Sequence, residues 1–131
     1  MKAKRYRKII IVFVSIFLIL LGMEIRRLSM SNLPHGEFIL ESMSPNGTHT
    51  INAYLIYPAL SSPSVRCEVI GNGTNKTRNI YWQYLEGWAD ILWETDEVVF
   101  INGIRLDVRK DKYNSRRYWN TTRLMEGELI K

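Results

Sequence analysis

Cysteine is almost absent from this chain: Cys67 stands alone among 131 residues. A single cysteine excludes an intrachain disulfide. Small animal domains exposed to an oxidising exterior usually carry disulfides, so their absence favours a bacterial protein outside the cytoplasm, at the low-disulfide surface of a Gram-positive-type cell. Cys67 alternates with Val65 and Val69 on the apolar face of a predicted strand, where a thiol acts as a small hydrophobic group and not as a reactive thiolate.

The chain also has few groups suited to catalysis or metal binding. Its two histidines, His35 and His49, and its one cysteine include no pair with the spacing of a zinc motif. Glycine-rich phosphate-binding motifs are missing as well. We therefore expect no catalytic residue, no metal ligand and no cofactor.

Positive charge is in excess, with 18 basic against 13 acidic residues, but the excess is confined to the N-terminus. Five basic residues lie among the first eight positions: Lys2, Lys4, Arg5, Arg7 and Lys8. The remaining 13 basic residues are balanced by the 13 acidic ones. A nucleic-acid-binding domain needs a basic face on the fold itself, so we expect no nucleic-acid partner.

A long apolar run, IIIVFVSIFLILLGM, follows this basic segment at Ile9–Met23. It has no polar stripe, which excludes an amphipathic helix of a soluble core. Counted over residues 6–25, the run is long enough to cross the roughly 30 Å hydrocarbon core of a membrane. A cleaved signal peptide is the alternative, but the following LLGMEIRRLSMS offers no small-residue cleavage site.

These features predict a cytoplasmic basic tail at 1–8 and a retained transmembrane signal anchor at 9–25. Because basic residues stay on the cytoplasmic side, the rest of the chain is expected outside a cell membrane that it crosses once. The membrane itself is then the first partner, through residues 6–25.

Beyond a connector at 26–36 the hydrophobic period becomes two, which is typical of β-strands. We expect a small, mainly antiparallel β domain at 37–110, a meander or small sandwich of six to seven strands. The polar stretch at 71–79 is expected to be a loop. A C-terminal extension at 111–131 is expected to pack on the sheet through Tyr113, Tyr118 and Trp119.

The clearest local prediction is a hairpin in EVVFINGIRLDV, 97–108. Asn102 and Gly103 suit a type I′ turn, in which both central residues have positive φ. One face of the hairpin then carries Val99, Ile101, Ile104 and Leu106, and the other carries Phe100, Arg105 and Asp107. Another turn is expected at SPNG, 44–47, where Pro45 presets φ and no lysine or helix follows to bind a phosphate.

Acidic residues gather at Glu94, Asp96 and Glu97. Paired carboxylates perform hydrolysis when they share a site, whereas polar residues in a strand-connecting turn are ordinary. Two of these carboxylates in one deep pocket would favour a cell-envelope hydrolase, and carboxylates splayed on an exposed turn would contradict it.

Aromatic residues are abundant for a chain of this length, with four tryptophans and seven tyrosines. They either fill a small core or form a binding platform. The surface we expect a partner to use, another envelope protein, comprises Tyr81, Trp88, Arg105, Asp107, Arg116 and Arg117.

Several segments together resemble a family of short bacillus-type proteins, the domain of unknown function family 5412. The resemblance rests on a Ser-Pro-Asn-Gly turn at 44–47, a Lys-Thr-Arg-Asn-Ile-Tyr-Trp stretch at 76–82, Trp93, and an Ile-Asn-Gly-Ile-Arg-Leu-Asp segment at 101–107. It covers most of residues 37–115 and implies an exported or membrane-tethered domain, with no catalytic residues to transfer. Some relatives are lipoproteins, but Met23 stands here where a lipid-accepting cysteine would be. The sequence thus predicts a non-enzymatic, membrane-anchored interaction module.

Overall fold

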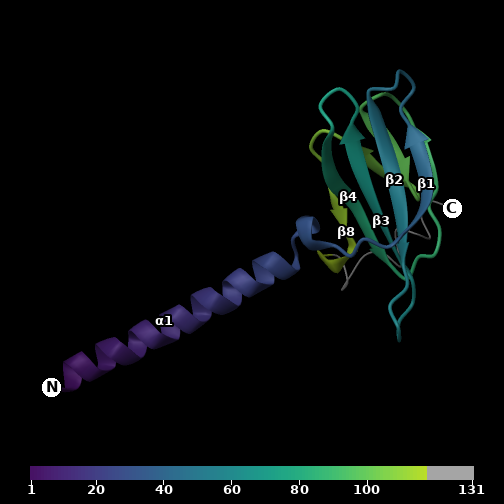
Figure 1. Ribbon diagram of the computed structural model, residues 1–131. Helices are drawn as coiled ribbons and strands as arrows, with labels where there is room; N and C mark the ends of the chain where they lie inside the picture. The colour runs from purple at the N-terminus through teal and green to yellow at the C-terminus, as the bar shows by residue number, and fades with distance from the viewer. Residues whose placement is uncertain (118–131) are drawn as a thin grey trace. The chain divides into compact units, whose positions relative to one another are not determined.

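The computed structural model describes residues 1–117 and consists of two compact units, Met1–Asn32 and a β unit that begins at Leu33 (Figure 1). The first unit contains α1, Lys2–Arg27, and the short 3-10 helix η1, Met30–Asn32. No residue of α1 is buried. α1 is long and apolar enough to cross a membrane. A signal sequence near an N-terminus can have the same length and composition. The hydroxyl of Ser15, the one polar side chain in the apolar run, donates to the Ile11 carbonyl at 2.8 Å and is thereby satisfied within the helix.

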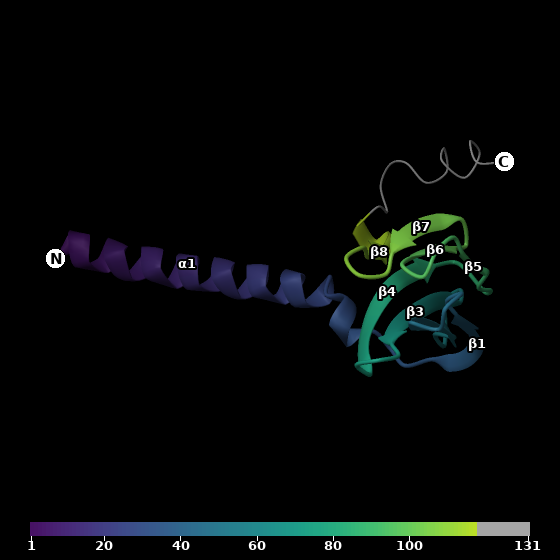
Figure 2. The ribbon, with the colours of Figure 1, turned by 90° about the horizontal axis from the view of Figure 1, so that it is seen from above.

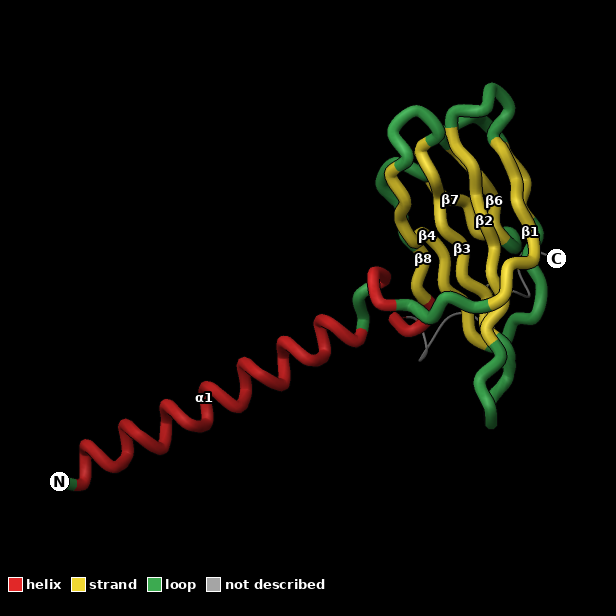
Figure 3. Tube along the Cα trace, in the orientation of Figure 1, coloured by secondary structure: helices red, strands yellow, loops and turns green. Residues whose placement is uncertain are grey.

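The β unit contains two sheets (Figure 3). The larger has the order β1-β2-β3-β4-β8, formed by Glu37–Met43, His49–Ile56, Ser64–Gly71, Lys76–Tyr84 and Tyr113–Asn114. The smaller has the order β5-β6-β7, formed by Ile91–Trp93, Val98–Ile101 and Ile104–Asp107. Neighbouring strands are antiparallel except β4 and β8, and a final 3-10 helix, η2, covers Ser115–Arg117.

The two sheets pack face to face, as the view along the strands shows (Figure 2). Their inner faces form one core whose most buried members are Ile51, Ala53, Val65, Cys67, Ile80, Tyr81, Val99 and Ile101. Burying an aliphatic side chain of this size contributes about 1.5–3 kcal/mol. The apolar side chains that alternate along the strands are therefore buried between the two sheets, and their burial stabilises the sandwich.

The predicted fold class is confirmed: an apolar N-terminal helix precedes a mainly antiparallel β domain, and the sandwich form is the one adopted. Seven of the eight strands in the described residues, β1–β7, lie within 37–110 and agree with the six to seven expected there, and the two-residue β8 lies in the extension that was expected to pack on the sheet. The loop expected at 71–79 is also shorter than predicted. Only residues 72–75 form a turn, and β4 already begins at Lys76.

The hairpin prediction is confirmed in detail. Asn102 has φ 47° and Gly103 has φ 79°, as a type I′ turn requires, and Ile101 pairs with Ile104. The turn at 44–47 is also present, with the Gly47 amide donating to the Ser44 carbonyl at 2.9 Å. Tyr118 and Trp119, expected to pack on the sheet, lie outside the described residues.

Candidate functional site

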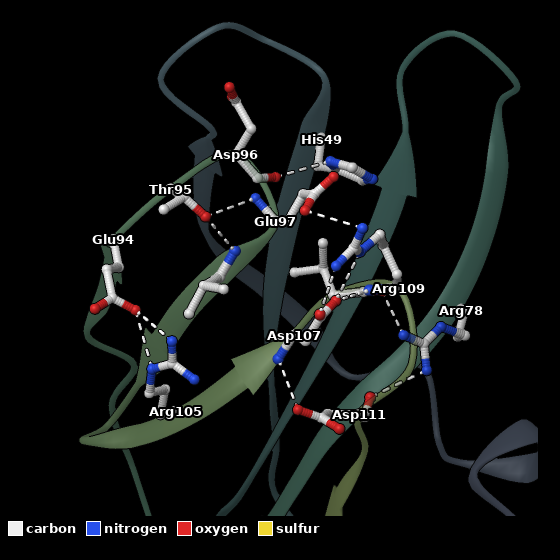
Figure 4. Close-up of polar contacts among 12 residues, drawn as sticks. His49, Arg78, Glu94, Thr95, Asp96, Glu97, Arg105, Asp107, Arg109 and Asp111 are labelled. Carbon is white, nitrogen blue, oxygen red and sulfur yellow. Dashed lines mark hydrogen bonds and ion pairs between the residues drawn. The ribbon is translucent and has the colours of Figure 1, made fainter.

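The three acidic residues that carried the hydrolase hypothesis lie in the turn between β5 and β6 and point in different directions (Figure 4). Glu94 pairs with Arg105 on β7 at 2.9 Å. Glu97 pairs with Arg109 at 3.0 Å, and both of these ion pairs are about half exposed. The arrangement therefore divides these carboxylates among separate partners and does not assemble the shared pair that hydrolysis needs.

The third carboxylate, Asp96, joins the turns of the two sheets. Its oxygens accept the backbone amide of Asn46 at 2.8 Å and the Asn46 side-chain amide. The Asp96 carbonyl also contacts the His49 ring at 3.0 Å. The hydrogen bond from the Asn46 backbone is the main cause that lowers the pKa of Asp96. The Ser-Pro-Asn-Gly turn is thus hydrogen-bonded to the β5–β6 turn of the other sheet, and we call these contacts of Asn46 and His49 with Asp96 the clasp between the sheets.

Asp107 lies at the end of β7, and its carboxylate accepts hydrogen bonds from the residues that follow it in the chain. It accepts the backbone amide of Arg109 at 2.9 Å and the guanidinium of the same residue at 2.9 and 3.1 Å. These hydrogen bonds hold the pKa of Asp107 well below its usual range. Arg78 on β4 donates to the carbonyls of Val108 and Asp111, so this turn is tied to the larger sheet. Asp107 therefore orders a turn and is buried, contrary to its predicted place on an exposed partner surface.

Tyr81, another residue predicted for the partner surface, is fully buried. Its hydroxyl donates to Glu86 at 2.7 Å, and its ring stacks on Tyr113 at 5.2 Å between centroids. The prediction was wrong for this residue, because it assumed strict alternation along β4. The register shifts where Cys67 pairs with Tyr81, and the extra residue, Ile80, lets two successive side chains enter the core.

The remaining predicted residues lie at or near the surface, in three different parts of the β unit. Trp88 is exposed in the loop after β4, and Arg105 is exposed on β7. Arg117 is exposed in η2. Arg116 is half-buried, donates to the Asn114 side chain at 3.0 Å and lies 6.0 Å from the centre of the Trp82 ring.

A polar cluster on the outer face of the larger sheet escaped the sequence reasoning. Arg66 on β3 is buried there, and its guanidinium lies 4.1 Å from the centre of the Tyr54 ring. It donates to Glu68 at 2.9 Å, to Asn79 at 2.7 Å and to the His35 carbonyl at 2.9 Å. The last contact fixes the chain that leads into β1 against the sheet. Burial and the hydrogen bond to Glu68 together raise the pKa of Tyr54.

This outer face also contains three buried polar atoms that have no hydrogen-bond partner among residues 1–117: Asn52 Oδ1, Arg66 Nε and Trp82 Nε1. The register places Arg66 directly opposite Trp82, and Asn52 one row away opposite Glu68. Such atoms are rare in folded proteins. Alternation alone gave no signal for the cluster, because a charged residue on an outer strand face ordinarily lies in water.

Among residues 1–117, no three histidine, cysteine or acidic side chains lie close enough to hold a metal ion. Cys67 is buried, and burial raises the pKa of its thiol far above the ordinary value. His49 Nδ1 contacts the Thr48 hydroxyl and the Asp96 carbonyl, so its ring belongs to the clasp between the sheets.

Comparison with known proteins gives one match. A protein-family model described as a family of unknown function (DUF5412) matches residues 4–118, a range that includes all but the first two residues of α1 and the whole of the described β unit. Neither the curated proteins nor the solved structures contain a significant match.

Proposed function

Because the chain belongs to the family of unknown function DUF5412, we propose its role from its own geometry: a single-pass membrane protein that presents a non-enzymatic interaction module outside the cytoplasm. The observation that carries this proposal is that the most apolar 18 residues of α1 are not buried against any other part of the described chain. Such a helix is stable only when a non-aqueous environment covers it. The five basic residues before the apolar run favour a cytoplasmic N-terminus.

The orientation is tested by thiol labelling of intact cells. Thr74→Cys, in the exposed turn before β4, is expected to react with a membrane-impermeant maleimide, and Lys4→Cys is expected to react only after the membrane is permeabilised. The single native cysteine is buried and provides a low background. Labelling of Lys4→Cys in intact cells, with Thr74→Cys protected, would refute the proposed topology.

The outer face of the smaller sheet supports the interaction role. Leu92 pairs with Phe100, and Phe100 pairs with Arg105, so the three form one row across β5, β6 and β7. Leu92 is 61% exposed although it occupies the centre of its strand. Apolar and arginine side chains together are typical of protein interfaces, and Arg105 was among the residues expected to contact a partner. The partner we propose for this face is another envelope protein.

The test is photo-crosslinking in cells from position 92, with position 77 as the matched control. Thr77 is also exposed on a strand but belongs to the larger sheet. A discrete crosslinked protein from position 92, absent from position 77 and lost in Arg105→Glu, supports the proposal. Equal crosslinking from both positions would contradict a specific contact at this face.

A non-enzymatic role is part of the same proposal, since the three turn carboxylates have separate partners. No observation favours the hydrolase alternative. Its test is direct: alanine substitution of Glu94, Asp96 or Glu97 is expected to change stability without abolishing the phenotype that deletion of the gene produces.

A further inference from the structure

One end of the β unit is defined by the chain segment that enters β1, and we call it the connector end. Glu37, the first residue of β1, pairs with Leu55 near the end of β2. The loops at 57–63 and 85–90 lie side by side here, because the Glu86 amide donates to the Pro63 carbonyl at 3.1 Å. The type I′ turn joins them where Asn102 Nδ2 donates to the Trp88 carbonyl at 3.0 Å. The connector end is thus a single surface made from three connections.

Exposed apolar side chains concentrate at this end. Between residues 33 and 117, eight large apolar or aromatic residues are exposed: Phe38, Ile39, Met43, Tyr57, Leu60, Leu85, Trp88 and Leu92. All except Met43 and Leu92 lie in the first residues of β1 or in the loops of the connector end. Leu60 is fully exposed, and its loop projects past the ends of the strands at the bottom of Figure 1.

The opposite end of the sandwich is polar. Its connections at 44–48, 72–75, 94–97 and 109–112 contain no apolar side chain except that of Pro45, and Met43 at the end of β1 is the one large apolar residue exposed beside them among residues 33–117. Single exposed apolar residues are ordinary on a protein surface, but a cluster confined to one end marks a contact. The contrast between the two ends therefore calls for an apolar neighbour at the connector end.

Leu85 strengthens this reading. Its φ is 58°, a left-handed conformation that a bulky residue rarely adopts, and its side chain is 67% exposed. A polar residue or glycine would fit both the backbone and the solvent better. The strained turn keeps an apolar side chain directed away from the core, which is consistent with a surface that binds.

The length of the connector identifies the neighbour. Residues 28–36 join α1 to β1, and nine extended residues span only roughly 30 Å. Gly36 is packed so closely that a Cβ would lie 2.8 Å from the Leu55 carbonyl oxygen, so the end of the connector is held against the sheet. With α1 in a bilayer, the connector therefore keeps this end of the β unit within roughly 30 Å of the lipid.

We propose that the connector end rests on the bilayer that holds α1, with Leu60, Leu85 and Trp88 inserted into its interface. This inference rests on the proposed membrane anchoring. Tryptophan and tyrosine favour the headgroup level, where their rings are apolar on one side and polar on the other. Acidic residues, among them Glu37 and Asp90, accompany Arg117 at this end, so apolar insertion drives the contact more than attraction to anionic lipid does.

The experiment uses the full chain in phosphatidylcholine vesicles, with and without phosphatidylglycerol. A nitrobenzoxadiazole label is attached at Leu60→Cys or Trp88→Cys, with Thr74→Cys as the control at the opposite end and Ile16→Cys as the control within α1. Doxyl groups on the lipid headgroups or acyl chains then report direct lipid contact by quenching, and unmodified protein verifies that Cys67 stays unlabelled.

The expected result is a blue shift and doxyl quenching at positions 60 and 88, in both lipid compositions, with neither effect at position 74. If position 16 is quenched while positions 60 and 88 are not, the anchor stands and the contact is refuted. A blue shift at position 60 without quenching would assign this surface to protein and also overturn the proposal. Absence of quenching at position 16 would refute the anchoring on which the inference rests.

Discussion

Replacing Arg66 by alanine is expected to lower the free energy of unfolding by about 3–5 kcal/mol, the range for breaking a buried ion pair. The Arg66 side chain is 6% exposed and that of Glu68 is 17% exposed, so the ion pair is largely shielded from water. After the substitution, the Glu68 carboxylate keeps the hydrogen bond that the Tyr54 hydroxyl donates at 2.7 Å, but it loses the cation that neutralises its charge. It also removes the donor to the His35 carbonyl.

The matched control is Arg105→Ala. The ion pair of Arg105 with Glu94 has the same 2.9 Å separation, but its side chains are 58% and 45% exposed. Exposed pairs of this kind contribute about 0–1 kcal/mol. The comparison therefore holds the ion-pair distance constant, while the burial of the pair and the further contacts of Arg66 with Asn79 and the His35 carbonyl differ.

Urea denaturation of the full-length protein in a nonionic detergent, followed by tryptophan fluorescence, measures both changes. The double variant Arg66→Met with Glu68→Gln is expected to recover most of the loss, because it leaves no buried charge unpaired. If Arg66→Ala costs less than about 1 kcal/mol, or no more than Arg105→Ala, the cluster is solvated and the reasoning is wrong.

Three further predictions concern the backbone, the acid response and the thiol. Gly36→Ala is expected to destabilise the protein by well over the roughly 1 kcal/mol expected for Gly103→Ala. Both glycines have positive φ, but only at Gly36 would the added Cβ lie within 3 Å of a backbone atom. Equal unfolding midpoints of the two variants in urea would contradict this prediction. The lowered pKa of Asp107 means that its contribution is present above the unfolded-state value near 4 and is lost as the pH falls towards the folded-state value. Thermal melts from pH 6 to pH 2 are expected to show a shallower acid loss for Asp107→Asn, and unchanged slopes would oppose the assignment. Cys67 is expected to react with a thiol reagent only after unfolding, so modification at the same rate with and without urea would show that it is accessible.

Alternation and turn chemistry were sufficient for much of the fold. Ile51, Ala53 and Leu55 face the core as their spacing predicts, and the Asn102-Gly103 hairpin has the predicted register. These features are local, since side-chain direction follows from strand period and turn type from φ preference. The apolar run needed no tertiary information either.

The candidate site was less accessible to such reasoning. Tyr81 was placed on the surface because alternation cannot anticipate a bulge, which depends on how β4 pairs with β3. The alternation in β7 predicts Asp107 as a contact residue, whereas its partner Arg109 lies two positions further along the chain, beyond the end of that strand. The Arg66 cluster gave no pattern at all, since its members come from different strands and the connector.

The sequence by itself determined the apolar helix, the strands with their apolar faces, and the neutrality of everything after the basic tail, because each depends on residues close together in the chain. Only the tertiary structure decided which polar groups meet. It separated the three turn carboxylates, joined Asn46 to Asp96 across 50 positions, and gathered exposed apolar residues from separate loops at the end where the connector arrives. The reason is physical: burial and pairing of a charge depend on groups brought together by strand order, and strand order is not written in any local pattern.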